Sequence, residues 1–342
     1  MIWLTWRQFR AQLLVVVVAL GVVALVFGLT GPGLAHLYDT SGLLTCHKAS
    51  TCAALKTSFL NSVKTDAVYP ALTIIGAALL YAAPVLTGAF LGAPLVSREF
   101  ETGTFRLAWH QSVTRVRWLA VKLAFIGLVA IATGAILSIT ITWWSSPVDH
   151  VGGMPLANGQ LGRFSPLIFG ARDVVPPGYF AFGFTFGVLV SLLVRRTLPA
   201  MAITLACVAL VLLAWPNFVR PHLISPVSTT TPITVNLTTA VVNHNGEVTM
   251  PITDLPGAWI VSNKTLTPNG SVFVLPTSGP CAGGSTEQCN AWFATQHLRR
   301  QISYQPATRY WSFQWAEVAI FLALSFLLAA LSMWWIKRWR VA

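Results

Sequence analysis

Six long runs of apolar residues constrain the fold of this chain more than any other feature. A helix needs roughly 20 consecutive apolar residues to cross the hydrocarbon core of a bilayer. The runs are continuous rather than alternating, which argues against a transmembrane β-barrel. The sequence therefore predicts an all-α polytopic membrane protein with six transmembrane helices, at about residues 12–31, 70–96, 118–144, 179–194, 198–215 and 315–336.

The distribution of charge predicts how these helices are oriented. The chain holds 22 Lys and Arg residues against ten Asp and Glu residues, and loops rich in Lys and Arg face the cytoplasm. With the N-terminus inside, the only acidic residues on the cytoplasmic side are Glu99 and Glu101. We therefore expect a bacterial cell-membrane protein with both termini in the cytoplasm. Contact with anionic membrane lipid explains the net charge of +12 without a nucleic-acid partner.

The sequence also predicts four parts along the chain. Residues 1–12 form an amphipathic interfacial helix, 13–215 hold the first five transmembrane helices, 216–314 form an external domain, and 315–342 hold the sixth helix and a basic tail. β-branched residues predict a mostly β external domain, interrupted by Gly-containing turns. Its expected strands are Ile233–Val242, Val248–Ile252 and Trp259–Val261, and Cys289–Gln301 is expected to be a short helix.

Four of the five cysteines fall in segments expected outside the cell, in two close pairs. Disulfides persist in such an oxidising compartment, so we predict the bonds Cys46–Cys52 and Cys281–Cys289, with Cys207 alone inside a helix. The alternative is a metal site at either pair. The nearby histidines, His150, His244 and His297, are too scattered to complete a metal site. No bound metal is therefore expected.

Motifs for catalysis are scarce in the sequence. It contains no G-x-x-x-x-G-K-[ST] phosphate loop, no H-E-x-x-H and no G-x-S-x-G. Ion-coupled carriers usually need carboxylates inside the membrane, whereas the apolar runs hold only Glu317. We therefore expect neither an enzyme nor a secondary transporter, no cofactor in this chain, and an energy source in a separate protein.

A short mixed-charge segment, residues 98–112, separates the second and third apolar runs. It predicts a helix end, a break at Gly103 and a short amphipathic helix whose start is capped by Thr102 or Thr104. Helical spacing forms an apolar stripe from Phe105, Ala108 and Trp109. Such a helix either docks into a groove on a partner protein or lies on the lipid surface.

Glu99-x-Glu101-x-Gly103-Thr104 resembles the E-x-E/K-x-G-T signature of ABC exporter permeases of the type-2 class, and Tyr304–Glu317 is similar to actinobacterial members with a large external loop. The resemblance implies a coupling helix seated on a separate ATPase that binds ATP and Mg. It implies two ATPase copies and two permease copies, as a homodimer or with a paralogue. In that family, the glutamates would pair with donors at the ATPase interface or on neighbouring helices. Gly103 would allow the turn, and three apolar residues would fill the ATPase groove: Phe105, Leu107 and Trp109.

Other residues have two interpretations each. Met201, Thr204 and Val208 match the family's path-lining fifth helix, or simply pack against neighbours. Four residues near the last helix either gate the external exit or form an aromatic belt with an Arg–Glu pair: Arg309, Tyr310, Trp311 and Glu317. We expect Trp143 and Trp144 to be belt residues, and small residues to permit close helix packing: Gly76, Ala77, Ala78, Gly88 and Gly92.

Together these features predict the permease subunit of an ATP-driven exporter. Its uncharged, aromatic-rich spans suit a hydrophobic or amphipathic substrate such as a drug, an antibiotic or a lipid. The alternative function is a membrane-anchored sensory or immunity protein whose external domain binds a ligand. A phosphate-loop ATPase that copurifies with the chain would favour the transporter.

Overall fold

The computed structural model describes residues 2–103, 114–156, 159–233, 240–243, 245–252, 255, 257–276, 278–283 and 285–338. The chain divides into two compact units. Unit 1 contains residues 1–220 and 311–342, and unit 2 contains residues 221–310.

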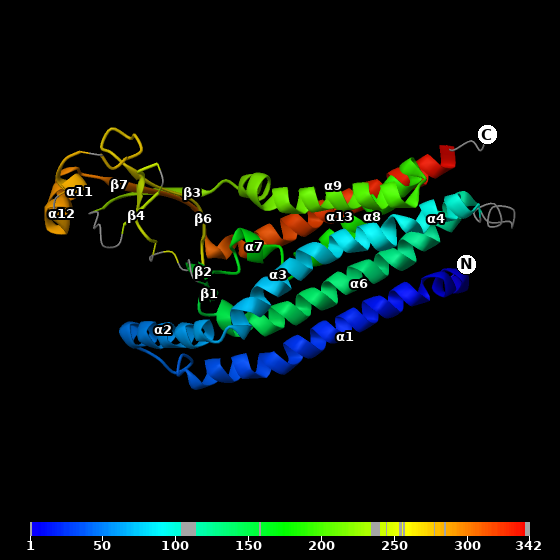
Figure 1. Ribbon diagram of the computed structural model, residues 1–342, viewed down its shortest axis with the longest axis horizontal. Helices are drawn as coiled ribbons and strands as arrows, with labels where there is room; N and C mark the ends of the chain where they lie inside the picture. The colour runs from blue at the N-terminus through cyan, green and yellow to red at the C-terminus, as the bar shows by residue number, and fades with distance from the viewer. Residues whose placement is uncertain are drawn as a thin grey trace. The chain divides into compact units, whose positions relative to one another are not determined.

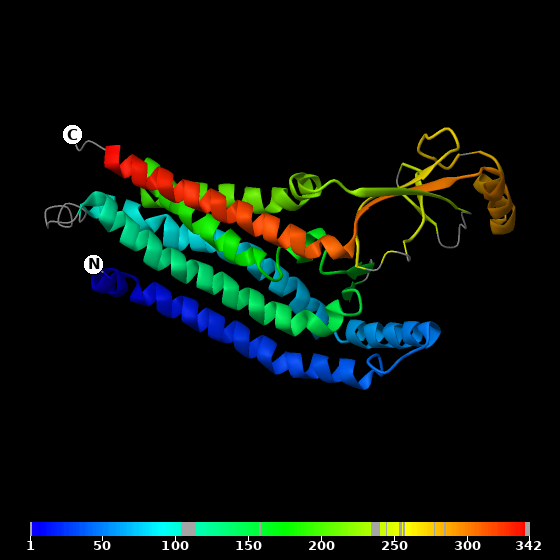
Figure 2. The ribbon, with the colours of Figure 1, turned by 180° about the vertical axis from the view of Figure 1, so that it is seen from behind.

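Unit 1 is built from long helices (Figures 1 and 2). In the part of the chain that is described, six of them are long and apolar enough to cross a membrane, which confirms the predicted number. One of the six is continuous through a π-helical turn and comprises α3 (Val68–Thr87), η1 (Gly88–Gly92) and α4 (Pro94–Thr102). The other five are α1 (Ile2–Thr40), α6 (Arg115–Asp149), α8 (Val175–Val194), α9 (Thr197–Phe218) and α13 (Tyr310–Arg338).

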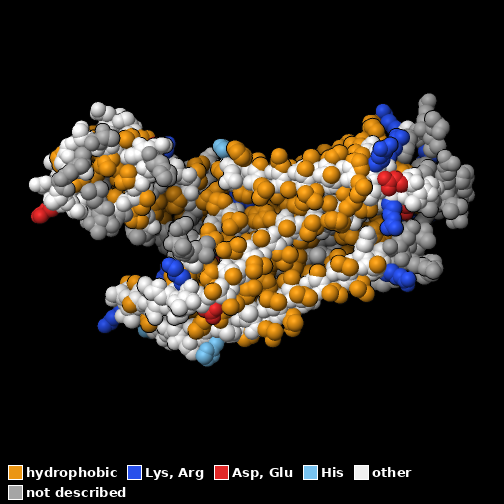
Figure 3. All heavy atoms as spheres, in the orientation of Figure 1, with side chains coloured by type: hydrophobic (Ala, Val, Ile, Leu, Met, Phe, Trp, Pro, Cys, Tyr) orange, Lys and Arg blue, Asp and Glu red, His pale blue; other side chains and the backbone are white. Residues whose placement is uncertain are grey.

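The surface of unit 1 is apolar along the helices and charged at both ends. In Figure 3, hydrophobic side chains cover the helices. Lys and Arg side chains gather where the chain termini and α4 lie, and others lie at the opposite end, where α2 (Ala49–Thr65) is. We call the end with the chain termini, which includes Phe9, Thr102, Arg115 and Val194, the terminal end. The opposite end, which includes Thr40, Val68, Asp149 and Phe218, is called the far end.

Glycines bring α3–η1 and α8 into backbone contact. A Cβ atom on Gly88 would lie 2.4 Å from the Gly183 carbonyl oxygen, and one on Gly187 would lie 2.2 Å from the Gly88 carbonyl oxygen. A Cβ on Gly92 would meet the Phe184 carbonyl at 2.5 Å. No side chain fits at these distances, so the prediction that Gly88 and Gly92 permit close packing is confirmed. Gly76 and Ala77 are also buried, whereas Ala78 is exposed.

Toward the far end, aromatic residues join α1, α3 and α6. Trp144 is 1% exposed, lies edge-on to Phe27 at 5.3 Å between ring centroids, and donates from Nε1 to Thr30 Oγ1 at 3.0 Å. The prediction that Trp144 is a belt residue is therefore wrong. Its neighbour Trp143 is 54% exposed, because successive helix residues point about 100° apart.

Short elements connect these helices at the far end. The Cys46–Cys52 disulfide is formed and joins Cys46 to the first turn of helix α2, which buries Phe59 and Val63. Between α6 and α8 lie a two-stranded ladder and a short helix: β1 (Met154–Leu156), β2 (Gly159–Leu161) and α7 (Pro166–Phe169).

Unit 2 contains the small sheet region that the sequence predicts. Strand β7 (Arg299–Gln305) lies between β3 (Val227–Pro232) and β6 (Trp259–Leu266), and both pairings are antiparallel. A second ladder pairs β4 (Val241–Val242) with β5 (Val248–Thr249). The remaining elements are short helices: α10 (Arg220–Leu223) at the unit boundary, α11 (Pro280–Gly283), α12 (Thr286–Thr295) and η2 (Ala307–Arg309).

Two element predictions in unit 2 hold only in part. The strand expected at Ile233–Val242 is present as β4 at Val241–Val242, whereas Ile233 follows the end of β3 and residues 234–239 lie outside the described part. The helix expected at Cys289–Gln301 starts at a Ser285 capping box and ends at Thr295, and the chain then forms the central strand. Partners on both sides of β7 outweigh its weak local signal. The predicted Cys281–Cys289 disulfide is formed.

Candidate functional site

The two glutamates of the mixed-charge segment lie on the last turns of α4 and contact different helices. Lys122 of α6 donates from Nζ to the Glu99 carboxylate. Lys122 is only 3% exposed, and its ammonium group also lies 4.4 Å from the centre of the Trp118 ring. Glu99 is therefore the charge partner that allows a lysine to be buried there.

Glu101 caps the start of α9. Its carboxylate accepts from the Thr197 backbone N–H at 2.8 Å and from the Thr197 hydroxyl at 2.6 Å. The N-cap residue of α9, Arg196, makes no side-chain cap of its own. The first N–H groups of a helix lack partners within it, so Glu101 supplies from another helix what a local cap normally supplies. Ser97 adds a hydroxyl contact to Thr197 at 3.1 Å.

These contacts attach α4 to its neighbours. The apolar face of α4 buries Leu95 and Val96 in a core shared with α6 and α8, which includes Trp118, Leu119, Val188 and Leu192. The Glu99–Lys122 pair adds a polar link to α6, and Glu101 adds one to α9. The end of α4 therefore contacts three other spans, α6, α8 and α9.

The helix breaks where the sequence predicts. Gly103 has a φ of 71°, and this left-handed conformation ends α4. The Thr102 hydroxyl donates to the Arg98 carbonyl at 2.9 Å, and the start of the predicted amphipathic helix lies outside the described part of the chain. Thr114 caps α6 by accepting from the Arg117 N–H at 3.3 Å. The remaining predicted coupling residues lie outside the described part of the chain: Thr104, Phe105, Leu107 and Trp109.

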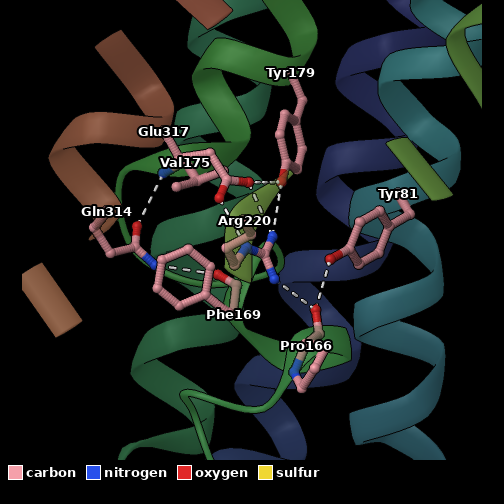
Figure 4. Close-up of polar contacts among 8 residues, drawn as sticks. All are labelled: Tyr81, Pro166, Phe169, Val175, Tyr179, Arg220, Gln314 and Glu317. Atoms are coloured by element: carbon pink, nitrogen blue, oxygen red, sulfur yellow. Dashed lines mark hydrogen bonds and ion pairs between the residues drawn. The ribbon is translucent and has the colours of Figure 1, made fainter. Parts of the chain in front are cut away.

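A second polar cluster is buried toward the far end and centres on Arg220 (Figure 4). Arg220 donates to both carboxylate oxygens of Glu317, from Nε at 2.8 Å and from Nη2 at 2.9 Å. The Tyr179 hydroxyl donates to the same carboxylate and accepts from Arg220 Nη2 at 3.3 Å. All three residues are completely buried. Burial lowers the pKa of Arg220, but the charge and hydrogen bonds of Glu317, together with the nearby Tyr179 and Tyr81, raise this pKa above its ordinary value.

Backbone carbonyls and a glutamine complete this cluster, as Figure 4 shows. Arg220 Nη1 donates to the Pro166 carbonyl at 2.9 Å, and the Tyr81 hydroxyl donates to the same oxygen at 3.3 Å. Gln314 donates to the Phe169 carbonyl at 3.1 Å and accepts from the Val174 and Val175 N–H groups at the start of α8. The cluster thus connects α3, α7, α8, α10 and α13.

The sequence prediction missed this cluster, and one pairing in it was wrong. Glu317 pairs with Arg220 rather than with Arg309, which instead donates to the Ser225 carbonyl at 2.8 Å and to Gln305 Oε1 at 3.0 Å. The sequence signal that could have indicated this pair is the opposite charge of Arg220, just after the fifth span, and Glu317, near the start of the sixth. Tyr310, which we grouped with the gate, is buried, and Trp311 is 47% exposed.

The residues proposed for a substrate path differ in burial. Thr204 and Val208 are fully buried within the chain, against the glycine contact of η1 and α8. Their burial agrees with the interpretation that these two side chains pack against neighbouring helices. Met201 is half-buried. Among the described residues, no three His, Cys, Asp or Glu side chains gather closely enough to hold a metal ion.

Comparison with known proteins gives one finding. The family model described as ABC-2 membrane transporter related matches residues 15–220, which is more than half of the chain. No curated protein and no solved structure matches the chain significantly. With its six apolar helices, this multi-pass membrane protein belongs to the ABC-2 membrane transporter related family and is a membrane transporter subunit.

Proposed function

We propose that the chain is the transmembrane permease subunit of an ABC exporter, driven by a separate ATPase docked on residues 98–112. Family membership supports association with an ABC ATPase. The Lys and Arg side chains at the terminal end support a cytoplasmic location for both termini. ATP and Mg are bound by the partner, because this chain has no phosphate loop.

The observation that carries this proposal is the attachment of α4 to three other spans. ATP binding closes the two ATPase subunits, and that motion displaces residues 98–112. Because Glu99 holds Lys122 on α6 and Glu101 holds Thr197 on α9, these helices follow α4 as a rigid group. The Arg220–Glu317 pair holds α8, α10 and α13 together at the other end of the bundle.

The assembly consists of two copies of this chain and two of the ATPase, with the substrate carried outward between the two permeases. The substrate is hydrophobic or amphipathic, in the class of drugs, antibiotics and lipids. Almost uncharged helix surfaces support this class, since they offer a charged solute few partners.

Copurification tests the docking part of this proposal. The tagged chain is isolated from membranes of its own host, and copurifying proteins are identified by mass spectrometry. We expect a phosphate-loop ATPase in stoichiometric amount with the wild type and with Glu287→Arg, a control in unit 2. We expect it to be lost with Glu101→Arg. An ATPase retained equally by Glu101→Arg, or absent from the wild-type preparation, would contradict docking at this segment.

A further inference from the structure

A lateral cavity opens between α1 and α3 in the half of the bundle nearer the terminal end. It has a volume of about 450 Å³ and is lined almost entirely by apolar side chains, which come from α1, α3, η1, α6 and α8. Its size falls within the range of ordinary ligand pockets. Closer to the far end the same helices meet, because Phe27 packs against Trp144 and lies beside Gly76. The cavity is therefore a closed-ended apolar slot.

The end of this slot nearest the terminal end is polar. Gln12 lines both the apolar cavity and a second pocket of about 310 Å³, whose other residues include Arg98, Glu99 and Thr102. Gln12 Oε1 is buried and has no hydrogen-bond partner among the described residues. A buried polar atom without a partner is costly, and it indicates that a ligand group belongs beside it.

The charge of the second pocket favours an anion. Glu99 is neutralised by its ion pair with Lys122. Arg98 is exposed and forms no ion pair with a described residue. A guanidinium group at the edge of an apolar slot matches a phosphate group attached to an alkyl chain.

We propose that this slot binds one anionic phospholipid with a glycerol headgroup. One acyl chain occupies the apolar cavity, the phosphate lies at Arg98, and a headgroup hydroxyl contacts Gln12. A hydroxyl both donates and accepts, so it satisfies the Gln12 amide whichever way its oxygen and nitrogen are placed. A choline headgroup has no such donor. This lipid site does not depend on the proposed coupling to an ATPase, and its test requires no ATPase.

Native mass spectrometry of the full chain tests this site. Delipidated protein in detergent is incubated with equal amounts of phosphatidylglycerol and phosphatidylcholine of the same chain length. The wild type is expected to retain one phosphatidylglycerol. Ala83→Trp fills the cavity and is expected to lose it, whereas Leu327→Trp, on an exposed part of α13, is expected to retain it.

The headgroup contact is tested by a second pair of variants. Arg98→Gln is expected to reduce the preference for phosphatidylglycerol about tenfold, as expected for losing one hydrogen bond to a charged group. Arg117→Gln removes an exposed arginine of α6 at the same end and is expected to leave the preference unchanged. An equal loss of the preference for phosphatidylglycerol in Arg98→Gln and Arg117→Gln would show that only the general charge of this end matters. That result would overturn the assignment of the phosphate to Arg98.

Photocrosslinking provides a measurement that does not depend on any variant folding. A phosphatidylglycerol with a diazirine in its acyl chain is expected to label peptides from residues 12–23 of α1 and 79–91 of α3–η1. Labelling spread evenly over all apolar helices would overturn the proposal. So would equal retention of the two lipids by the wild type, or equal lipid retention by Ala83→Trp and Leu327→Trp.

Discussion

Arg220 and Glu317 are charged residues that the fold removes completely from solvent. Removing two charges from water costs free energy that their mutual attraction offsets only when the geometry is good and the remaining polar atoms are bonded. Both conditions hold here, because the pair is bidentate and the Tyr179 hydroxyl and the Pro166 carbonyl satisfy further atoms. Removal of one partner should therefore be more harmful than removal of both.

We expect Glu317→Gln to lower the free energy of unfolding by about 3–5 kcal/mol, because it leaves the Arg220 charge buried without a counterion. The double variant Arg220→Met/Glu317→Gln should recover a large part of this loss. Thermal unfolding in detergent, monitored by size-exclusion chromatography, measures the stability of the single and the double variant. Glu287→Gln is the surface control. A double variant less stable than Glu317→Gln would contradict this account of the pair.

A similar argument applies to Lys122 at the other end of the bundle. Glu99 is less buried than Glu317, so solvent weakens the pair and we expect Lys122→Met to cost less, about 2 kcal/mol. The exposed Lys64 provides the control Lys64→Met. Double-mutant cycles with Glu99→Gln measure the coupling between the two side chains. A coupling energy of zero would show that the contact does not hold α4 to α6.

At the scale of single residues, contacts between residues close in sequence were predictable, and contacts between distant residues were not. Both disulfides follow from cysteines six and eight positions apart. Glu99 and Glu101 were identified by their setting between apolar runs, although their partners Lys122 and Thr197 were not. Arg220 and Glu317 are 97 positions apart, and their contact exists only because the topology places the start of α10 beside the first turns of α13.

Among the elements, the contact between α3–η1 and α8 depends most directly on residue type. Glycines on both helices face each other, so backbone atoms replace side chains at the crossing. Such small-residue crossings are a common way to pack helices in a bilayer, where apolar burial alone does not hold helices together. The π-helical turn η1 lies at this crossing.

We expect Gly183→Ala to destabilise unit 1 by about 1–3 kcal/mol, because its Cβ would lie 2.4 Å from the Pro84 carbonyl oxygen. Gly28→Ala in α1 is the matched control, since nothing lies within 4 Å of the position of its Cβ. Alanine favours helix over glycine, so this control should be as stable as the wild type or slightly more stable. Equal melting temperatures for the two variants would contradict the importance of this contact.

Helices were predictable at the element scale, and strands were only partly so. A continuous apolar run of sufficient length determines a spanning helix almost independently of its surroundings. The strand β7, in contrast, has a weak local signal and forms because β3 and β6 pair with its two edges. Helix α2 was missed for a related reason, because only Phe59 and Val63 are buried along it.

At the scale of the whole molecule, the two units have separate cores. The core of unit 2 contains Phe273, Phe293 and Cys289, and Cys289 is bonded to Cys281. We expect Cys281→Ser/Cys289→Ser to destabilise unit 2 by about 2 kcal/mol, through the greater entropy of the unfolded chain. Hydrogen exchange should be faster in β6 and β7 and unchanged in α8. The Cys207→Ser control should alter neither, and faster exchange in α8 would show that the units do not unfold separately.

The central claim also concerns the whole molecule: motion of an ATPase enters the membrane through the end of α4. It rests on the contacts of Glu99 with α6 and of Glu101 with α9, together with membership of a transporter family. A passive anchor would bind the ATPase without changing its turnover. A coupled permease must change it, because the conformations of the two proteins are then linked.

The most direct test is the ATP hydrolysis rate of the copurified ATPase, measured in nanodiscs with and without this chain at equal ATPase concentration. Our account predicts that the rate changes severalfold when the chain is present. It also predicts that Glu101→Arg abolishes the change, whereas Glu287→Arg preserves it. Identical hydrolysis rates with and without the wild-type chain would contradict the claim that this protein is a coupled permease.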